Sequence, residues 1–529
     1  MGLEDSKLLQ KYINFGEKKA GSTSMGIFVG LFAAFGGILF GYDTGTISGI
    51  LAMDYVTARF PKNNESFTSS ETSLIVSILS VGTFFGSLSA SFFSDKLGRR
   101  WTLIIATLVI FNLGIILQTA ATSIPLLCVG RVFAGLGVGL ISAVIPLYQA
   151  ETVPKWIRGA VVSCYQWAIT LGILLANVVN QGTHARNDSG SYRIPIAVQF
   201  LWAIILGGGM LILPETPRFW VSKGDEARAK DSLSRLRKLP IDNPDLIDEY
   251  DEIKANFDFE NQYGSGSWGQ VFANKNHQRK RLLMGVGIQA LQQLTGINFI
   301  FYFGTTFFKR AGIKNEFVIQ MATSIVNFGS TVPGILLIEV LGRRKLLLGG
   351  SCIMAVSQLI VAIVGVATGQ GSTSANQCLV AFVCIFIAAF AATWGPLCWA
   401  VIAECYPLSV RQKSISLCTA SNWLWNWGIA YATPYMVNSG PGNANLGSKV
   451  FFIWGGCNVI GGLFVWALVY ETKGLTLEQV DELYEKVPQA WHSSKFIPAE
   501  NAFRQPSRAE SLASSSKAEG VSEVEEASV

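Results

Sequence analysis

The feature that most constrains the fold is a set of long segments without a single charged residue. Trp101 to Gly130 and Leu346 to Ala403 contain no Asp, Glu, Lys or Arg. A helix that crosses a bilayer needs about 20 mostly apolar residues, so the second segment is long enough for two crossings. Only 15% of the 529 residues are charged, against about 25% in an ordinary soluble domain. The sequence therefore predicts an all-α protein that crosses the membrane many times.

Twelve mostly apolar segments, each long enough to cross a bilayer, follow one another along the chain. The expected helices cover residues 26–52, 73–91, 102–119, 125–147, 160–181, 194–213, 283–307, 317–338, 346–368, 378–402, 414–437 and 450–470. The first one contains Asp43, and no cleavage-type sequence follows it. We interpret it as a retained helix rather than a signal peptide.

The basic residues predict the orientation, because Lys and Arg concentrate in cytoplasmic loops. One set of loops carries Lys96, Arg99, Arg100, Lys155, Arg158, Arg343, Arg344, Lys345, Arg411 and Lys413. The opposite loops near 120–124 and 369–377 carry none, and only Lys309 and Arg310 go against the pattern. Both termini are therefore expected in the cytoplasm. The two N-x-S/T sequons, at Asn64 and Asn187, fall in outer loops and are candidate glycosylation sites.

A polar, charged segment separates six expected helices from the other six. The predicted organisation is a cytoplasmic segment over 1–25, a six-helix half over 26–213, a cytoplasmic linker with short helices over 214–281, a second half over 282–470 and a cytoplasmic tail over 471–529. From about 485 to 529 the tail is rich in Ser, Ala and Glu, as in Ser511–Lys517, and has too little apolar content to fold. We expect it to be mostly disordered and to meet the phosphorylation or ubiquitination machinery.

The two halves repeat the same motifs in the same order. Asp95–Arg100 matches Glu339–Arg344, and Glu151–Arg158 matches Glu404–Arg411 in the form E-x-x-P-x-x-x-R. Glu215 and Glu471 close the two halves. All three pairs share an offset of roughly 250 residues. The chain is thus a duplicated six-helix unit, and a binding site between two such halves is a transporter architecture.

Amide side chains recur at one depth inside the expected helices. At about 1.5 Å per residue, Gln292, Gln293, Asn327 and Asn422 lie about 15 Å along their helices, and Gln166 about 10 Å. Amides both donate and accept hydrogen bonds and carry no charge. They fit a neutral polyol better than an ion. The alternative is hydrogen bonding between helices alone.

The motifs together resemble those of the sugar porter family of the major facilitator superfamily. The matching segments are Gly41–Gly49, Asp95–Arg100, Arg131 with Gly135–Gly139, Glu151–Arg158, Pro214–Arg218, Gln292–Asn298, Gly342–Arg344, Glu404–Arg411 and Glu471–Leu475. They span about residues 26 to 480, and Thr393–Tyr406 looks most similar to fungal hexose transporters. The resemblance implies the twelve-helix major facilitator fold.

The resemblance also implies roles for individual residues. Sugar-contacting positions in the family match Gln166, Gln292, Gln293, Asn298, Asn327, Trp399 and Asn422, with Trp423 and Asn426 as weaker candidates. The charged motifs at the cytoplasmic helix ends are expected to form a gate from Asp95, Arg99, Arg100, Glu151, Arg158, Glu215, Glu339, Arg343, Arg344, Glu404, Arg411 and Glu471. Ion pairs between the halves would close the inner mouth. The alternative is that these charges only anchor the topology.

Asp43 and Arg131 are the ionisable residues inside expected helices, and such residues are functional candidates. Proton-coupled members of the family resemble this chain at both positions. Protonation of Asp43 would release Arg131 and couple a proton to the sugar. A purely structural ion pair is the alternative, because some uniporters look the same at Asp43.

These observations predict a hexose transporter of the plasma membrane, working by alternating access as a facilitator or a proton symporter. A glucose sensor of the same fold is the alternative, although sensors have longer tails than the residues that follow 470 here. The three histidines and nine cysteines form no metal-site spacing. No nucleophile–base arrangement indicates an enzyme. We therefore expect a monosaccharide substrate, possible proton coupling and a lipid bilayer, without cofactor, metal or nucleic acid.

Overall fold

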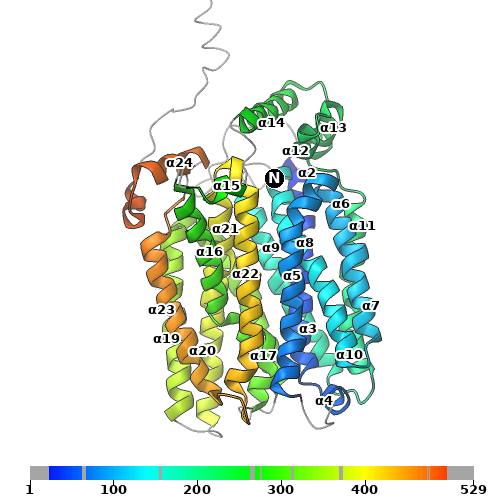
Figure 1. Ribbon diagram of the computed structural model, residues 1–529, viewed down its shortest axis with the longest axis vertical. Helices are drawn as coiled ribbons and strands as arrows, with labels where there is room; N and C mark the ends of the chain where they lie inside the picture. Colours follow the sequence, from blue (N-terminus) through cyan, green and yellow to red (C-terminus); the bar gives the residue numbers. More distant parts are fainter. Residues whose placement is uncertain are drawn as a thin grey trace, which may run out of the picture.

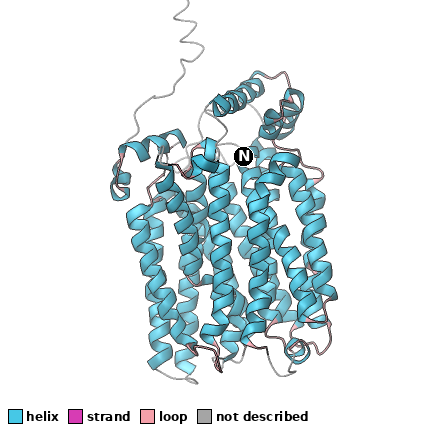
Figure 2. Cartoon of the chain, viewed as in Figure 1, coloured by secondary structure: helices cyan, strands magenta, loops and turns pink. Residues whose placement is uncertain are grey.

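The computed structural model describes residues 23–61, 67–153, 158–262, 268–273, 277–310, 315–367, 373–473, 475 and 477–496. Within these ranges the protein consists of helices, turns and loops, with no strand, as Figure 2 shows. The long helices stand side by side in one bundle, and short helices lie across one end of it (Figure 1). The serine-rich tail, including 511–517, lies outside the described residues.

The first half of the bundle begins at Thr23. Its helices are α2 (Thr23–Ala34), α3 (Gly36–Ile50), α4 (Asp54–Arg59), α5 (Ser69–Leu97), α6 (Arg99–Ile104), the π-helix η2 (Ile105–Phe111), α7 (Asn112–Ala120), α8 (Ile124–Thr152), α9 (Arg158–Thr183), α10 (Gly190–Ala197) and α11 (Gln199–Met210). Pairs such as α2 and α3, or α10 and α11, are two parts of one crossing.

The second half follows the linker helices. The linker contains α12 (Pro217–Ser222), α13 (Glu226–Arg237), α14 (Pro244–Gln262) and α15 (Trp268–Val271). The second half contains α16 (Gln278–Leu294), α17 (Ile297–Arg310), α18 (Glu316–Leu341), α19 (Arg343–Ala367), α20 (Thr373–Ala392), α21 (Trp394–Glu404), α22 (Leu408–Val437), the short η4 (Gly447–Lys449) and α23 (Val450–Leu468). After it come α24 (Leu477–Lys486) and η5 (Ala490–Lys495).

Twelve membrane crossings result, and each expected apolar segment overlaps one of them. Among the described residues, ten crossings are long and apolar enough to be recognised by hydropathy. The pair α16–α17 and the helix α22 complete the set, and both carry polar side chains along their length. The predicted all-α, twelve-helix fold is therefore confirmed.

One end of the bundle carries the linker helices, α24 and the start of α2 (Figure 1). The basic loops of the sequence belong to this end, and we call it the inner end, following the predicted orientation. The opposite end, with α4 and α10, is the outer end. At the inner end α24 docks on the second half: Asp481 forms an ion pair with Arg281, whose guanidinium lies 4.3 Å from the centre of the Tyr484 ring.

The two halves meet mainly along α5 with α22, α3 with α17, and α9 with α18, and α9 also contacts α21. Hydrogen bonds cross this seam in its outer part. Ser48 and Thr305 join α3 to α17 (3.1 Å), Asn177 and Ser324 join α9 to α18 (2.8 Å), and the Ser73 hydroxyl donates to the carbonyl of Tyr431 (2.7 Å). The outer end of the bundle is thus held together across the halves.

A break in the seventh crossing separates α16 from α17 at Thr295 and Gly296. Gly296 has a φ of +85°, which favours glycine, and a Cβ there would lie 2.6 Å from Cγ of Trp454. The tenth crossing breaks at Thr393, between α20 and α21. Both breaks lie beside the buried amides described next.

Candidate functional site

Amide side chains from α16 and α22 form a buried cluster at mid-depth in the second half. Asn422 donates to Gln289 (2.7 Å) and Gln292 (2.9 Å), and accepts from the Nε2 of Gln293 (2.9 Å). Gln289, Gln292 and Gln293 lie on one face of α16 because residues three and four apart are neighbours on a helix. All four side chains are buried.

The cluster continues onto α17 through the helix break. Asn298 donates to Oε1 of Gln293, and Asn426 donates to the same oxygen at 3.2 Å. The hydroxyl of Tyr302 in turn donates to Oδ1 of Asn426 at 3.1 Å. The break therefore brings the polar start of α17 to the amides of α16 and α22.

The first half contributes polar groups to the same region. Ser80 on α5 donates to Oδ1 of Asn426 at 2.6 Å, across the seam. The Nε2 of Gln166 on α9 lies 3.7 Å from the position that a Cβ on Gly395 would take, so Gln166 faces α21. Gln292 on α16 donates to the carbonyls of Trp394 (2.9 Å) and Gly395 (3.0 Å) at the start of α21. Gln166 and Gln292 thus approach α21 from opposite halves.

Aromatic rings also meet across the seam near the cluster. The rings of Phe40 on α3 and Trp423 on α22 are 5.2 Å apart, edge to face, and those of Trp167 on α9 and Phe328 on α18 stack at 5.1 Å. Trp399 on α21 is half-buried against the core. Ring faces of this kind can pack against the C–H groups of a sugar.

The structure brings most, but not all, of the predicted sugar-binding residues into one hydrogen-bonded cluster. Gln292, Gln293, Asn298 and Asn422 share one hydrogen-bonded cluster. Asn327 on α18 is buried, yet its amide makes no hydrogen bond with the described residues. The amide of Gln166, which is half-buried, makes none with them either. Sequence reasoning overlooked Gln289, Tyr302 and Ser80. The spacing of Gln289 from Gln292 and Gln293 is a signal that would have found it.

Asp43 and Arg131 lie next to each other between α3 and α8, and each is 1% exposed. The Arg131 guanidinium and the Gln199 amide face the Asp43 carboxylate. Neither carboxylate oxygen makes a hydrogen bond of standard geometry within the described residues. No ion pair within 4 Å joins Asp43 to Arg131 among these residues. Asp43 and Arg131 are therefore neighbours that do not form a direct ion pair.

At the inner end of the first half, the Glu215 carboxylate caps the start of α6, and the Glu151 carboxylate forms an ion pair with Arg99, the first residue of that helix. The oxygens of Glu215 accept the backbone N–H groups of Arg99 (3.1 Å) and Arg100 (2.9 Å) at the start of α6. The Arg99 guanidinium binds Glu151 at 3.0 Å. Burial raises the pKa of Glu215, against the lowering effect of backbone N–H groups of Thr216 and Arg100. Gly98, at φ +92°, lets the carboxylate approach.

The second half repeats this arrangement. Glu471 accepts the N–H groups of Arg343 (3.0 Å) and Arg344 (3.1 Å), and Arg343 binds Glu404 at 2.8 Å. Gly342 has a φ of +87° at the equivalent position. We call the two copies the inner-end motifs: Gly98, Arg99, Arg100, Glu151 and Glu215 in one half, and Gly342, Arg343, Arg344, Glu404 and Glu471 in the other.

The sequence predicted ion pairs between the two halves, but the described ion pairs of the inner-end motifs lie within one half. Arg99–Glu151 and Arg343–Glu404 each join two residues of one half. The reason is the repeat itself, because each half brings its own helix ends together. Asp95 lies 3.9 Å from Arg99, and Arg411 donates to the carbonyl of Tyr406. The side chains of Arg158 and Glu339 lie outside the described residues.

The two sequons have different outcomes. Asn64 lies outside the described residues. Asn187 is exposed in the outer loop between α9 and α10, beside the exposed ion pair of Arg186 and Asp188 (2.8 Å). Its glycosylation stays a prediction.

Two repeated six-helix halves, with a neutral polar cluster buried in the second half beside the seam, define a membrane transporter of the alternating-access class. The chain matches the family described as "Sugar (and other) transporter" over residues 29–484 and belongs to it. Its fold is accordingly the major facilitator fold, and members of this family are transporters rather than enzymes.

Relatives with curated descriptions include transporters and a sensor. A major facilitator-type transporter of Aspergillus rugulosus is 55% identical over 91% of each chain. The high glucose sensor of Saccharomyces cerevisiae is 48% identical over 90% of this chain and 62% of the sensor. A probable glucose transporter of Neurospora crassa is 48% identical over 91% of this chain and 82% of its own length.

Among solved structures, the proton:xylose symporter XylE bound to 6-bromo-6-deoxy-D-glucose matches with a TM-score of 0.74 and 27% identity. The match covers 88% of this chain and 100% of that chain. The partially occluded inward open form of XylE from E. coli gives a TM-score of 0.70 at 26% identity, over 85% and 99% of the two chains.

Proposed function

We propose that this protein carries a hexose of the glucose type across the plasma membrane by alternating access. The observation that carries the proposal is the amide cluster around Asn422. It is uncharged, buried at mid-depth and built from groups that both donate and accept, which matches a sugar hydroxyl. The names of the relatives, which include glucose and hexose transporters, support the same substrate class.

The placement of the cluster supports a mechanism. Gln289, Gln292, Gln293 and Asn422 all belong to the second half, so a sugar held by them stays with that half. The first half reaches the region through Ser80 and Gln166. Rocking of the first half against the second would open the site to one side at a time. The inner-end motifs would then stiffen each half, so that the gate opens between two rigid bodies.

Proton symport is the first candidate for the driving force. Asp43 is buried beside Arg131 without a direct ion pair. Proton uptake by Asp43 would remove its attraction for Arg131 and change the balance between the two conformations. Facilitated diffusion, with Asp43 in a structural role, is the second candidate.

The test is uptake of labelled D-glucose, with external pH recorded, in cells that lack their own hexose carriers. Wild type and Asp43→Asn are compared at equal surface expression, with and without a protonophore. A symporter accumulates sugar and alkalinises the medium, and Asp43→Asn loses that coupling. If uptake only equilibrates and ignores the protonophore, the protein is a facilitator and symport is rejected. If no tested hexose enters cells that display the protein, the transport proposal itself fails.

A glucose sensor is the second candidate function, because the chain is 48% identical to the high glucose sensor over 90% of its own length. A sensor would produce a glucose-dependent transcriptional response in the same cells without measurable sugar entry. Uptake that follows saturable kinetics, without any change in a glucose-responsive reporter, would reject this alternative.

We further propose that both termini lie in the cytoplasm, with the tail beyond 496 open to phosphorylation and ubiquitination. An epitope at either terminus should be reached by antibody only after permeabilisation. Treatment with a glycosidase should shift the mobility of wild type but not of a variant in which Asn64 and Asn187 are both replaced by Gln. Labelling of an intact cell at either terminus would overturn the orientation.

A further inference from the structure

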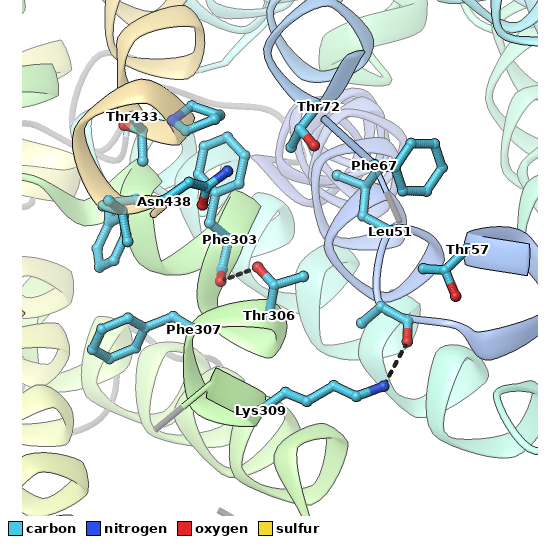
Figure 3. A pocket seen from close by; sticks show the side chains of 14 residues that line it. Leu51, Thr57, Phe67, Thr72, Phe303, Thr306, Phe307, Lys309, Thr433 and Asn438 are labelled. Atoms are coloured by element: carbon cyan, nitrogen blue, oxygen red, sulfur yellow. Dashed lines mark hydrogen bonds between the residues drawn. The ribbon is translucent and has the colours of Figure 1, made fainter. Parts of the chain in front are cut away.

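A pocket of about 240 Å³ lies at the outer end of the seam (Figure 3), and none of the amides of the cluster lines it. Both halves line it: the turn after α3 together with α4 and α5 from the first, and α17 and α22 from the second. Phe299, Phe303 and Phe307 repeat every four residues on one face of α17. Thr72, Thr306 and Thr433 add hydroxyl groups. The walls thus combine aromatic rings with neutral hydrogen-bonding groups.

The pocket lies in line with the amide cluster along the same three helices. On α22, Thr433 comes seven residues after Asn426, and on α5, Thr72 comes eight residues before Ser80. At about 1.5 Å per residue, the pocket is about 10 Å closer to the outer face than the cluster. On α17, Phe299 and Phe303 directly follow Asn298 and Tyr302. A solute that enters the seam from outside therefore meets the pocket first.

Lys309 closes the pocket toward the outer face. Its ammonium group reaches from α17 to the first half, where it binds Asp54 at 3.1 Å and the carbonyl of Ala52 at 3.4 Å. In Figure 3 the Lys309 side chain extends along the edge of the pocket to that carbonyl. The pair is exposed on both sides, so it is weak and can open readily. This contact also accounts for Lys309, a basic residue at the outer end, where the positive-inside rule predicts few basic residues.

We propose that the outer pocket is a waiting site for a monosaccharide, occupied before the sugar moves on to the amide cluster. The occupant is a neutral sugar rather than an ion, because Lys309 is the one charged residue of the described lining and Asp54 beside it brings a balancing charge to the rim. Aromatic faces contact the C–H groups of the ring, and threonine hydroxyls contact its hydroxyls. The proposal rests on the proposed function, since it assumes that hexose is the solute transported.

The test measures protection of a cysteine placed in the pocket. Thr306 is half-buried and lines the pocket, so Thr306→Cys is labelled with a membrane-impermeant maleimide in intact cells. The same labelling is repeated in Asn422→Ala/Gln292→Ala, which disables the amide cluster, and in Gln293→Ala, which also removes a cluster member, as a second background. Only backgrounds that label at the unchanged rate without sugar are used. Ser123→Cys, exposed in another outer loop, is the matched control, and the parent chain corrects for native cysteines.

D-glucose at ten times its dissociation constant should slow labelling of Thr306→Cys about tenfold by mass action, in the intact and the disabled backgrounds alike. Ser123→Cys should be unaffected, and sucrose controls for osmotic strength. Protection that disappears once the amide cluster is disabled would assign the effect to a conformational change and overturn the waiting site. Equal slowing at Ser123 would also overturn it. Failure of the proposed function is read separately, as absence of hexose uptake by wild type.

Discussion

Asn422 is the residue that ties the amide cluster together. Its side chain bonds three glutamines of α16, so both its donor and its acceptor atoms are used. An amide inside a bilayer is stable only when it finds such partners, and each of these bonds contributes about 0.5–1.5 kcal/mol. Asn422 is fully paired, whereas the Nε2 of Gln289 is buried without a partner among the described residues. The cluster can therefore exchange bonds with a sugar and also offers it an unused donor.

Replacing Asn422 with Ala should therefore weaken sugar binding more than it harms folding. We expect the KM for hexose to rise about tenfold, which corresponds to about 1.4 kcal/mol. Uptake kinetics at matched surface expression give the answer. Asn112→Ala, on α7 away from the cluster, removes a half-buried amide that donates to a helix carbonyl and should change KM less than about twofold. Equal effects of both substitutions would contradict the site.

The sequence could indicate single residues of the site but not their connections. Helix depth and resemblance pointed to Gln292, Gln293 and Asn422, which do contact one another. They did not find Tyr302, because its contact with Asn426 depends on the angle between α17 and α22. They also grouped Asn327 with the others, although depth alone does not say which way a side chain points.

Helix breaks are the element-scale feature that positions this site. The break at Gly296 ends α16 just after its glutamines and starts α17 just before Asn298. Without it, one continuous helix would carry Asn298 and Tyr302 away from α22. Gly296 is thus a structural requirement of the site as much as of the fold.

Gly296→Ala should destabilise the protein and reduce transport together. An alanine at positive φ costs roughly 1–2 kcal/mol, and its Cβ would also meet Trp454. We expect a lower midpoint of thermal unfolding in detergent and a higher KM. Gly208→Ala is the matched control, because a Cβ there has nothing within 4 Å. It should leave both measurements within error; a Gly296→Ala protein that behaves like it would refute the role of the break.

At this scale the sequence predicted every crossing but none of the breaks. Apolar length locates a helix, and for that reason all twelve expected segments overlap real ones. It also explains why hydropathy alone misses α16–α17 and α22, whose polar side chains form the amide cluster. The docking of α24 against Arg281 was not predicted, since it depends on a tertiary ion pair.

At the scale of the whole molecule, the contrast between the two ends of the bundle matters most. Most cross-seam hydrogen bonds lie in the outer part of the bundle, and in the inner part the Ser416 hydroxyl donates to the carbonyl of Ser87 at 3.4 Å. The described ion pairs of the inner-end motifs stay within one half. Alternating access then requires the outer bonds to break while each inner-end motif stays intact. The duplicated motifs allowed the two halves to be predicted from the sequence. They did not show whether the charged residues form ion pairs within one half or between the halves, because the repeated sequence is the same in both cases.

Cross-linking Ser48→Cys to Thr305→Cys tests this requirement. The two hydroxyl oxygens are 3.1 Å apart across the seam. A disulfide between the cysteines should fix the outer end closed and abolish hexose uptake after oxidation, with recovery after a reductant. Each single variant, oxidised in the same way, should keep its activity. Undiminished uptake by a fully cross-linked protein would show that the outer seam does not have to open.

The location of the amide cluster has a consequence for how such proteins can diversify. Gln289, Gln292, Gln293, Asn298 and Asn422 all lie within 282–470, so recognition is encoded in one contiguous stretch of the gene. Recombination that exchanges this stretch between two relatives should transfer sugar preference in a single event, leaving Asp43 and Arg131 behind. Chimeras assayed with competing hexoses should follow the parent of the second half, whereas any change in proton dependence should follow the parent of the first.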